Sequence, residues 1–535
     1  MDRFCDLFFI SRYPPTIPFA VSKAVTMMNL LLDNTSARFP LNAALIFQNR
    51  SYTYADLSRL TQCLAASLLQ RGISPGDRVA FLLPNCLEIV LCYYACFKIG
   101  AIAVPLNIRF QPELLKYCLT HSGARVLISE PELSGRIEEI RSSLPGLEQY
   151  YLTSSYTTYA RPFSELLEAN VDSAGLPVLD QNCAAAIYYT SGTTGLPKAV
   201  VHSHTSLARA TQIQIDQIAI SSEDRTLIMF PICYLIGFGS QILPFHSSGA
   251  SCILLPHFEP RLALETIQTY KPTKTYGFPQ LYNDLVNHPE ADQYDIRSLN
   301  FCFSAGEAVP VAIQQRFKRI FGVEITEGCG MTELQIYSMN PPYGQKKIGS
   351  IGQPVAGMEV SLIDEIGRPI SSPGQIGEMI VRGGSMTAGY WRNPQLTARN
   401  IKNGWFHTGD LAYKDEEDFY WFVSRKSEII RHRAGMVSPI EVEGVLYQHP
   451  SVRQAGVIGV PDRRGYELVQ AHVVLKRGSA PIAERQLIDF AGMHLPEYKV
   501  PHQIIFTESL PSGPTGKTDR KILREAAISL LQSEG

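Results

Sequence analysis

The strongest constraint on the fold is a run of hydroxyl, glycine and lysine residues, Tyr-Tyr-Thr-Ser-Gly-Thr-Thr-Gly-Leu-Pro-Lys over residues 188–198, between two short apolar runs. Residues 184–189 and 198–202 predict two buried strands, with the Ser/Thr/Gly segment as the turn that joins them. Glycines let successive backbone N–H groups point into one concavity, the hydroxyls add donors, and Lys198 supplies positive charge. This is typical of a phosphate-binding loop, although not of a Walker loop, because the lysine follows Leu-Pro rather than Gly. Taken alone, the segment could equally be a polar hairpin turn.

Length and charge limit the possible classes of protein. A chain of 535 residues exceeds the usual size of one hydrophobic core, so we expect two or more domains. The 48 Lys and Arg residues nearly balance the 50 Asp and Glu residues, which leaves a net charge of −2. No global field therefore recruits nucleic acid or an anionic membrane, and any anion binding must be local.

The cysteines and apolar runs indicate a cytoplasmic location. The eleven cysteines form no CxxC pair and no cluster at zinc spacing, which favours a reducing compartment. Residues 87–106 form the longest apolar stretch, but Glu88 and Lys98 interrupt it, so we expect a core helix and strand rather than a membrane span. The first residues make a poor signal peptide because an acid lies inside a short apolar run.

The order of apolar and amphipathic segments predicts an α/β fold with helix-covered parallel sheets. Expected strands are residues 79–83, 101–104, 125–128 and 251–255, and expected helices are residues 54–72 and 112–122.

Changes in composition and in segment length along the chain predict where domains begin and end. We expect an extension over residues 1–27 and a large domain over residues 28–424, in which short strands separated by Gly and Pro form a small β subdomain from about residue 349. A smaller α+β domain is expected over residues 425–535, after a short polar hinge.

Five further motifs follow the loop, and the ordered set is specific. Together they resemble the adenylate-forming superfamily, which includes acyl-CoA synthetases, 4-coumarate-CoA ligase, firefly luciferase and the adenylation domains of peptide synthetases. The resemblance covers roughly residues 28–526 and implies a mobile C-terminal domain. The motifs are Ser-Ala-Gly-Glu at 304–307, Thr-Glu-Gly-Cys-Gly-Met-Thr-Glu at 326–333, Trp-Phe-His-Thr-Gly-Asp at 405–410, Arg-Lys-Ser-Glu at 425–428 and Pro-Thr-Gly-Lys-Thr-Asp-Arg at 514–520.

The resemblance implies a two-step reaction. A carboxylate is a poor acyl donor, so it first attacks the α-phosphorus of ATP and gives acyl-AMP and pyrophosphate. A thiol then displaces AMP. Since the transition state is anionic, the protein must supply cations and aimed hydrogen-bond donors rather than a nucleophile.

By resemblance, Lys517, Thr332, Glu333 and Lys198 are the catalytic residues. Glu333 would hold Mg²⁺, and Lys517 would swing to the α-phosphate on the mobile domain. The implied ATP contacts are Thr190, Ser191, Gly192, Thr193, Thr194, Gly195, Lys198, Gly306, Glu307, Ala308, Glu327, Gly328, Cys329, Thr332, Asp410, Arg425 and Lys517.

Other assignments by resemblance concern the ribose, the hinge and the thiol. Asp410 follows a His-Thr-Gly turn that would expose its carboxylate to the ribose diol, and Arg425 would bind nearby. The alternative is an Asp–Arg surface ion pair. Glu428 stands at the hinge position, where the family usually has Asp. Residues Arg433, Ala434 and Gly435 lie in a stretch that resembles the segment approaching the pantetheine of CoA, although the family usually has Lys and Gly where Arg433 and Ala434 stand.

The acid pocket is also assigned by resemblance. None of its residues is a cation, so the substrate beyond its carboxylate is expected to be apolar or aromatic. An amino acid would need a buried acid for its ammonium group, and the Tyr234 segment offers none. Cys329 stands where an aromatic residue often lies against adenine. The pocket residues are Tyr234, Gly237, Phe278, Ser304, Gly330 and Met331, with Gln335 beside them.

These features predict an ATP-dependent carboxylate–CoA ligase that acts on a fatty or aryl acid, with ATP and Mg²⁺ as cofactors and CoA as co-substrate. Alternatives are an enzyme that loads the phosphopantetheine arm of a separate carrier protein, and a catalytically weak nucleotide-binding homologue. Oxygenase activity of the luciferase kind is not excluded by the motifs. No nucleic-acid partner and no transmembrane segment are expected, and the oligomeric state is left open.

Overall fold

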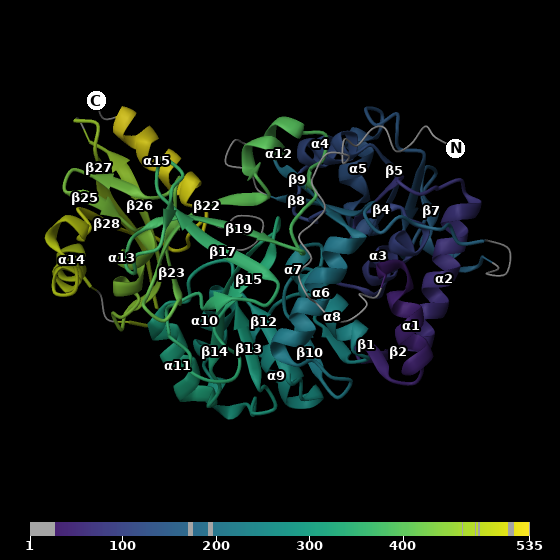
Figure 1. Ribbon diagram of the computed structural model, residues 1–535, viewed down its shortest axis with the longest axis horizontal. Coiled ribbons are helices and arrows are strands. Elements are labelled where there is room, and N and C mark those ends of the chain that lie inside the picture. The colour runs from purple at the N-terminus through teal and green to yellow at the C-terminus, as the bar shows by residue number, and fades with distance from the viewer. Residues whose placement is uncertain are drawn as a thin grey trace.

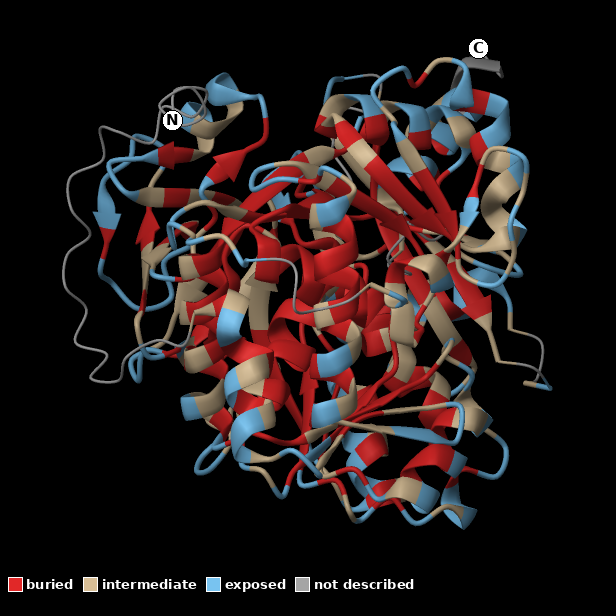
Figure 2. Ribbon diagram, turned by 90° about the vertical axis from the view of Figure 1, so that its right-hand side faces the viewer, coloured by how far each residue is buried: buried red, intermediate tan, exposed pale blue. Residues whose placement is uncertain are grey.

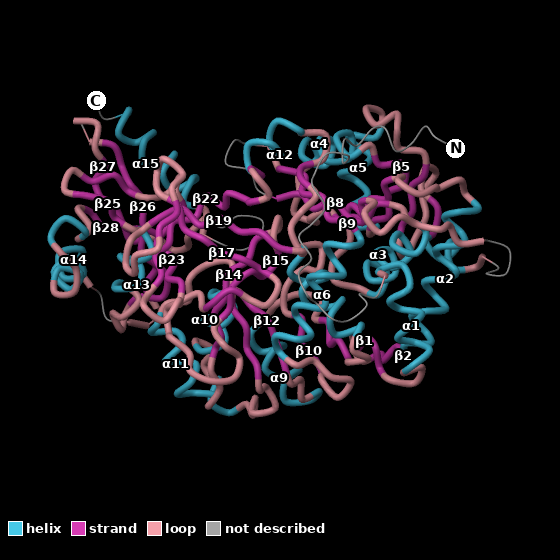
Figure 3. Tube along the Cα trace, viewed as in Figure 1, coloured by secondary structure: helices cyan, strands magenta, loops and turns pink. Residues whose placement is uncertain are grey.

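The computed structural model describes residues 27–169, 175–190, 196–462, 464–476, 478–479, 482–511 and 518–533. Strands run through the middle of the molecule and helices cover them, as Figures 1 and 3 show. Figure 2 shows buried residues concentrated on the central sheets and on the helix faces against them. The α/β prediction is confirmed.

An eight-stranded sheet carries the phosphate-loop hairpin. Its strands β4, β3, β5, β6, β7 and β8 pair in parallel, whereas β8–β9 and β9–β20 are antiparallel. The two strands predicted around the Ser/Thr/Gly segment are therefore a hairpin at this end of the sheet. In spatial order the strands are β20 (Gly389–Tyr390), β9 (Lys198–Ser203), β8 (Ala184–Thr190), β4 (Ile102–Pro105), β3 (Arg78–Leu82), β5 (Ala124–Ser129), β6 (Gln149–Leu152) and β7 (Arg161–Pro162).

A nine-stranded sheet carries the other predicted nucleotide motifs. It is parallel from β1 to β14, and β2, β15 and β16 add antiparallel edges. The ends of β13 and β14 therefore place two motifs at one edge. In spatial order the strands are β16 (Gln353–Pro354), β15 (Gln335–Met339), β14 (Ile325–Met331), β13 (Phe301–Ser304), β12 (Lys274–Gly277), β10 (Arg225–Ile228), β11 (Ser251–Leu254), β1 (Ala43–Phe47) and β2 (Arg50–Thr53).

The helices predicted over residues 54–72 and 112–122 are both present: α4 (Pro112–Ser122) has the predicted bounds, and α2 (Tyr54–Gln70) begins as predicted but ends two residues earlier. In α2, Thr53 and Asp56 form a capping box, and Arg71 follows the last helical residue. Helix α3 is buried almost throughout, and its Lys98 pairs with Asp33, which offsets the burial of the charge. The helices are α1 (Leu31–Arg38), α2 (Tyr54–Gln70), α3 (Leu87–Ile99), α4 (Pro112–Ser122), α5 (Ser134–Arg141), α6 (His204–Ile218), α7 (Leu235–Gly237), α8 (Leu243–Ser247), α9 (Pro260–Tyr270), α10 (Pro279–Val286), α11 (Val311–Phe321) and α12 (Pro394–Asn400).

A third sheet follows, built from short antiparallel strands as the Gly- and Pro-rich texture predicts. Its strands are β18 (Pro369–Ile370), β17 (Met358–Ile363), β19 (Gly377–Gly383), β22 (Trp405–Lys414) and β21 (Ile401–Lys402), with β23 (Tyr420–Arg425) paired to β22.

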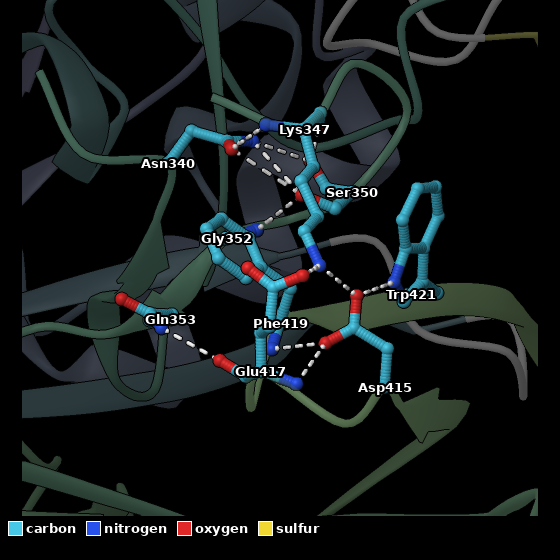
Figure 4. A network of polar contacts seen from close by, with 9 residues as sticks. All are labelled: Asn340, Lys347, Ser350, Gly352, Gln353, Asp415, Glu417, Phe419 and Trp421. Atoms are coloured by element: carbon cyan, nitrogen blue, oxygen red, sulfur yellow. Dashed lines mark hydrogen bonds and ion pairs between the residues drawn. The ribbon is translucent and has the colours of Figure 1, made fainter. Parts of the chain in front are cut away.

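An ion-pair network joins this sheet to the nine-stranded sheet (Figure 4). Lys347 Nζ donates to Asp415 Oδ2 at 2.7 Å and to Glu417 Oε1 at 2.8 Å. Trp421 Nε1 donates to Asp415 Oδ2 at 3.1 Å. These contacts hold the β22–β23 hairpin, which ends at Arg425.

The elements after Arg425 lie together at one end of the molecule (Figure 1). Val457, Val469 and Ala471 of their three-stranded sheet form a core of their own. The division into domains stays a prediction. The elements are β24 (Ile430–His432), β25 (Gly435–Val437), α13 (Pro439–Leu446), β26 (Val452–Pro461), β27 (Glu467–Leu475), α14 (Glu484–Gly492), β28 (Gln503–Phe506) and α15 (Arg520–Ser533).

Candidate active site

The phosphate-loop hairpin places two of its predicted contacts opposite each other. Thr190 pairs with Lys198 at the ends of β8 and β9 that adjoin the loop. Lys198 lines a cavity of about 330 Å³ whose walls come from α4, β9, β20 and α12, and His121 and Arg399 add two more basic side chains to it. Among the described residues, no acidic side chain lines the cavity. The other predicted phosphate contacts lie outside the described residues: Ser191, Gly192, Thr193, Thr194 and Gly195.

The turn that carries Thr332 and Glu333 joins β14 to β15. Two hydrogen bonds attach this turn to β9 and to the segment that leads into β20. His202 Nε2 in β9 donates to the carbonyl of Thr332 at 2.7 Å. The backbone N–H of Thr387 donates to the carbonyl of Glu333 at 2.7 Å. Burial lowers the pKa of His202 to about 4, so its imidazole is neutral at physiological pH. The predicted catalytic turn is thus fixed to the strand that begins at Lys198.

The Glu333 carboxylate is buried and has a hydroxyl partner. Tyr390 donates its O–H to Glu333 Oε1 at 2.8 Å, and Asn400 Nδ2 donates to the Tyr390 oxygen at 3.0 Å. Burial, and then the charge of Glu333, raise the pKa of Tyr390, which keeps the phenol protonated.

The donor set at Glu333 fits Mg²⁺ held jointly with a nucleotide. In the parts of the chain that the structure describes, no three His, Cys, Asp or Glu side chains group together as a metal site would require. Mg²⁺ is often bound by one or two carboxylates together with substrate phosphates. Glu333 supplies one such carboxylate beside the lysine-lined cavity.

Asp410 and Arg425 face each other on neighbouring strands β22 and β23. Arg425 Nε lies 2.8 Å from Asp410 Oδ1, and the Asp410 side chain is only 4% exposed. The predicted exposure of this carboxylate at a turn is therefore wrong: Asp410 lies inside β22, and pairing with β23 covers it. Burial opposes the charge on Arg425, but Asp410 together with Tyr337, Cys329 and Glu428 outweighs this effect and raises the pKa of the guanidinium.

Cys329 joins this pair. Its Sγ lies 3.0 Å from the hydroxyl oxygen of Tyr337, and both residues interact electrostatically with Arg425. The structure thus brings the residue predicted beside adenine close to the two predicted at the ribose.

Glu327 hydrogen-bonds to protein groups. It accepts from the backbone N–H groups of Val309 at 2.8 Å and Gly349 at 3.1 Å, and from Gln314 Nε2 at 2.5 Å. Burial raises the pKa of Glu327 to about 7. These contacts hold the loop after β13, which carries the predicted ATP residues Gly306, Glu307 and Ala308.

Gly328 and Gly330 lie where no side chain fits. A Cβ at Gly328 would come within 2.6 Å of both the Phe303 ring and the carbonyl oxygen of Ser338, and one at Gly330 would come within 2.6 Å of the carbonyl oxygen of Gln335. Such contacts explain glycine at both positions.

The predicted acid-pocket residues lie at the carboxyl ends of neighbouring strands. Gly277 and Ser304 pair between β12 and β13, which places Phe278 beside Ser304 at the sheet edge. Met331 pairs with Gln335 across β14 and β15. Phe278 and Ser304 are buried, while Met331 is partly buried.

The Tyr234 segment completes the predicted wall. Asn107 Nδ2 donates to the Tyr234 hydroxyl at 2.6 Å. A Cβ at Gly237 would lie 2.8 Å from Ile232 Cα, so this tight turn requires glycine. The hydroxyl of Tyr234 is therefore held at a fixed position on the wall.

The predicted hinge and thiol residues lie after the third sheet. Arg520 Nη1 donates to Glu428 Oε2 at 3.4 Å, and Arg520 Nη2 donates to Glu443 Oε2 at 2.8 Å. Residues Arg433 and Ala434 form the exposed connection between β24 and β25, and Gly435 starts β25. Lys517 lies outside the described residues, but the Arg520 contacts anchor the start of α15 beside Glu428.

Three contributors to the site were missed by sequence reasoning: His202, Tyr390 and Asn400. His202 and Tyr390 act through partners that are distant in sequence, with separations of 130 residues for His202–Thr332 and 57 for Tyr390–Glu333. Asn400 acts on Tyr390, which lies 10 residues before it. The Gly-Tyr-Trp segment and the Asn at the end of α12 carry no local pattern that indicates such a contact.

Comparison with known proteins places the chain in a family. The model described as AMP-binding enzyme matches residues 32–391, and the one described as AMP-binding enzyme C-terminal domain matches residues 441–517. The chain therefore belongs to the AMP-binding enzyme family.

Its relatives are acid–CoA ligases by name. The chain is 31% identical over 547 residues to the long-chain-fatty-acid–CoA ligase of Bacillus subtilis (strain 168), with 97% of each chain covered. It is 34% identical over 468 residues to a feruloyl-CoA synthase of Amycolatopsis sp, covering 87% of this chain and 92% of the relative. The structure of the anthranilate CoA ligase AuaEII in complex with anthranoyl-AMP matches with a TM-score of 0.89 at 30% identity, covering 96% of this chain and 99% of that one.

Across the described helices, none combines the length and apolar character needed to cross a membrane.

Proposed function

We propose that this chain is an ATP-dependent carboxylate–CoA ligase that forms an acyl-adenylate and then an acyl-CoA thioester. The observation that carries the proposal is the hydrogen bond from His202, which attaches the Thr332–Glu333 turn to the phosphate-loop strand. Lys198 and Tyr390, the hydrogen-bond partner of Glu333, line the same cavity. A carboxylate and a cation fixed this way suit a metal–triphosphate. The names of the relatives agree with this activity.

In the first half-reaction, the oxygen of the substrate carboxylate attacks the α-phosphorus and pyrophosphate leaves. Lys198 would hold the leaving phosphates, and Thr332 would donate its hydroxyl to the α-phosphate. Mg²⁺, held by Glu333, would neutralise charge on the phosphate oxygens. Lys517 would supply the second cation at the α-phosphate.

The nucleoside would be held by the Asp410–Arg425 pair. A buried carboxylate whose position is fixed by a guanidinium can accept both hydroxyl protons of a ribose diol. Cys329 would border the adenine, since it shares the environment of Arg425.

The acid is proposed to be fatty or aryl. The wall offers aromatic Phe278 and the fixed hydroxyl of Tyr234, and no cation is among the wall residues. Phe278 lies against Phe230 with ring centroids 5.4 Å apart, which makes an apolar surface suited to a chain or ring.

The thiol acceptor is proposed to be CoA. In the second half-reaction the thiol sulfur attacks the acyl carbonyl carbon, AMP leaves with the bonding electrons, and the thiol proton is released. The exposed turn at Arg433 and Ala434 and neighbouring Gly435 would approach the pantetheine after rotation about Glu428. We further propose that residues 28–424 form the large domain, including a β subdomain over about 349–424, and residues 425–535 the mobile domain.

The cytoplasm is the proposed compartment. All cysteines in the described ranges are free thiols and most are buried, as expected where disulfides do not form.

Carboxylate-dependent exchange of ³²P-pyrophosphate into ATP tests the first half-reaction, across aryl, medium-chain, long-chain and amino acids. Addition of CoA with thioester detection tests the second. We expect exchange and thioester with one class of apolar acid. Exchange without thioester would instead favour a carrier-protein acceptor, and no exchange despite ATP binding would contradict the proposal.

A further inference from the structure

Tyr390 donates a hydrogen bond to the Glu333 carboxylate. The residue is 5% exposed, and its hydroxyl lies 2.8 Å from Glu333 Oε1. Within the described residues, no hydrogen bond reaches Oε2. One carboxylate oxygen is thus fixed by the protein, and the other can face a ligand.

Asn400 determines the direction of the Tyr390 proton. Its Nδ2 donates to the phenol oxygen at 3.0 Å. Because the phenol oxygen accepts this hydrogen bond and carries one proton, that proton points to Glu333.

The backbone around Tyr390 is fixed to the phosphate-loop strand. The N–H of Trp391 donates to the carbonyl of Ala199 at 2.8 Å, and the N–H of Ala388 donates to that of Val201 at 3.0 Å. Tyr390 itself pairs with Val200. Tyr390 therefore sets the position of Glu333 relative to the strand that begins at Lys198.

We propose that Tyr390, oriented by Asn400, is a positioning residue that holds Glu333 in the geometry needed to bind a divalent cation together with the ATP phosphates. This inference rests on the proposed function. Loss of the phenol hydroxyl would leave a buried carboxylate free to rotate, and partners of this kind typically contribute about 10- to 100-fold to metal affinity or activity.

The test compares Tyr390→Phe with Tyr420→Phe in the full-length protein. Tyr420 is a matched control because it is also 5% exposed and its hydroxyl donates to the carbonyl of Val360 at 2.9 Å. Mn²⁺ binding in the presence of a non-hydrolysable ATP analogue is titrated by electron paramagnetic resonance of the free ion. Mn²⁺ is the probe because carboxylate and phosphate oxygens bind it as they bind Mg²⁺.

We expect Tyr390→Phe to weaken Mn²⁺ binding by about 10-fold or more, with no change in Tyr420→Phe. Asn400→Ala, which keeps the phenol, should weaken it by roughly 3-fold, as expected for loss of a neutral hydrogen bond. In pyrophosphate exchange, the half-saturating Mg²⁺ concentration should rise by the same factors while the KM of the acid is unchanged.

Wild-type Mn²⁺ affinity in Tyr390→Phe would overturn the inference. Should that variant fail to fold by circular dichroism, wild-type affinity in Asn400→Ala would overturn it instead. Absence of exchange in the wild-type protein would contradict the proposed function alone, because the Mn²⁺ titration needs no turnover.

Discussion

Three buried histidines predict that the part of the protein before Arg425 loses stability between pH 7 and pH 5. Burial lowers the pKa of His202, His204 and His246 to about 4 in each case. In the unfolded chain a histidine titrates near pKa 6.5. Between these values the unfolded chain binds more protons than the folded protein, so the free energy of unfolding falls as pH falls.

The size of the effect follows from the two pKa values. Each histidine should remove about 2 kcal/mol between pH 7 and pH 5, and the three together about 5 to 6 kcal/mol. Glu327 acts in the opposite direction because its folded pKa is raised to about 7, so it takes up a proton in the folded state first. Glu327 should therefore add about 2 kcal/mol to the free energy of unfolding between pH 7 and pH 5. The net loss from these four groups is about 3 to 4 kcal/mol.

His204→Phe isolates one contribution. Nε2 of His204 is buried without a hydrogen-bond partner among the described residues, and the ring lies edge-on to Phe97 at 5.6 Å. An aromatic hydrocarbon should therefore fit, with a stability at pH 7 within about 1 kcal/mol of wild type.

The assay is urea denaturation at pH 7 and pH 5, followed by tryptophan fluorescence. Trp391, Trp405 and Trp421 are the three tryptophans of the chain, and all precede the expected hinge. His204→Phe should lose about 2 kcal/mol less than wild type on going to pH 5. Equal losses in the two proteins would refute the reasoning that burial keeps His204 neutral.

Three further substitutions test the other parts of the site. Asp410→Asn removes the charge that pairs with Arg425, and we expect the KM for ATP in pyrophosphate exchange to rise about 10-fold or more, because a charged acceptor binds the ribose hydroxyls more strongly than an amide; an unchanged KM would contradict the ribose assignment. Arg520→Met leaves the buried Glu443 without its cation and should destabilise the region after Arg425 by about 3 to 5 kcal/mol, measured by hydrogen exchange, whereas adding Glu443→Leu should recover most of this loss. No recovery in the double variant would show that the ion pair is not the cause. Lys517→Ala should abolish acyl-adenylate formation and leave thiolation or hydrolysis of supplied acyl-AMP largely intact; equal loss of both half-reactions would contradict its role.

The sequence predicted the elements whose signals are local. Helix α2 was expected over residues 54–72 and spans Tyr54–Gln70, and β8 and β9 follow their apolar runs. The Gly- and Pro-rich texture after residue 349 became short antiparallel strands, because Gly and Pro interrupt each apolar run after a few residues.

Contacts between distant segments could not be predicted in this way. The Tyr390–Glu333 hydrogen bond exists because β20 pairs with β9 across the sheet, and neither residue carries a local sign of the other. The burial of Asp410 was missed for the same reason: a His-Thr-Gly-Asp sequence indicates a turn, but pairing of β22 with β23 keeps the segment in a strand and covers the carboxylate.

The central claim is that the chain joins a carboxylic acid to AMP before thiol transfer. Carboxylate-dependent exchange of ³²P-pyrophosphate into ATP, measured without CoA, tests it most directly. Exchange is expected with an apolar fatty or aryl acid and is not expected without an acid. ATP binding without exchange for any acid class would contradict it.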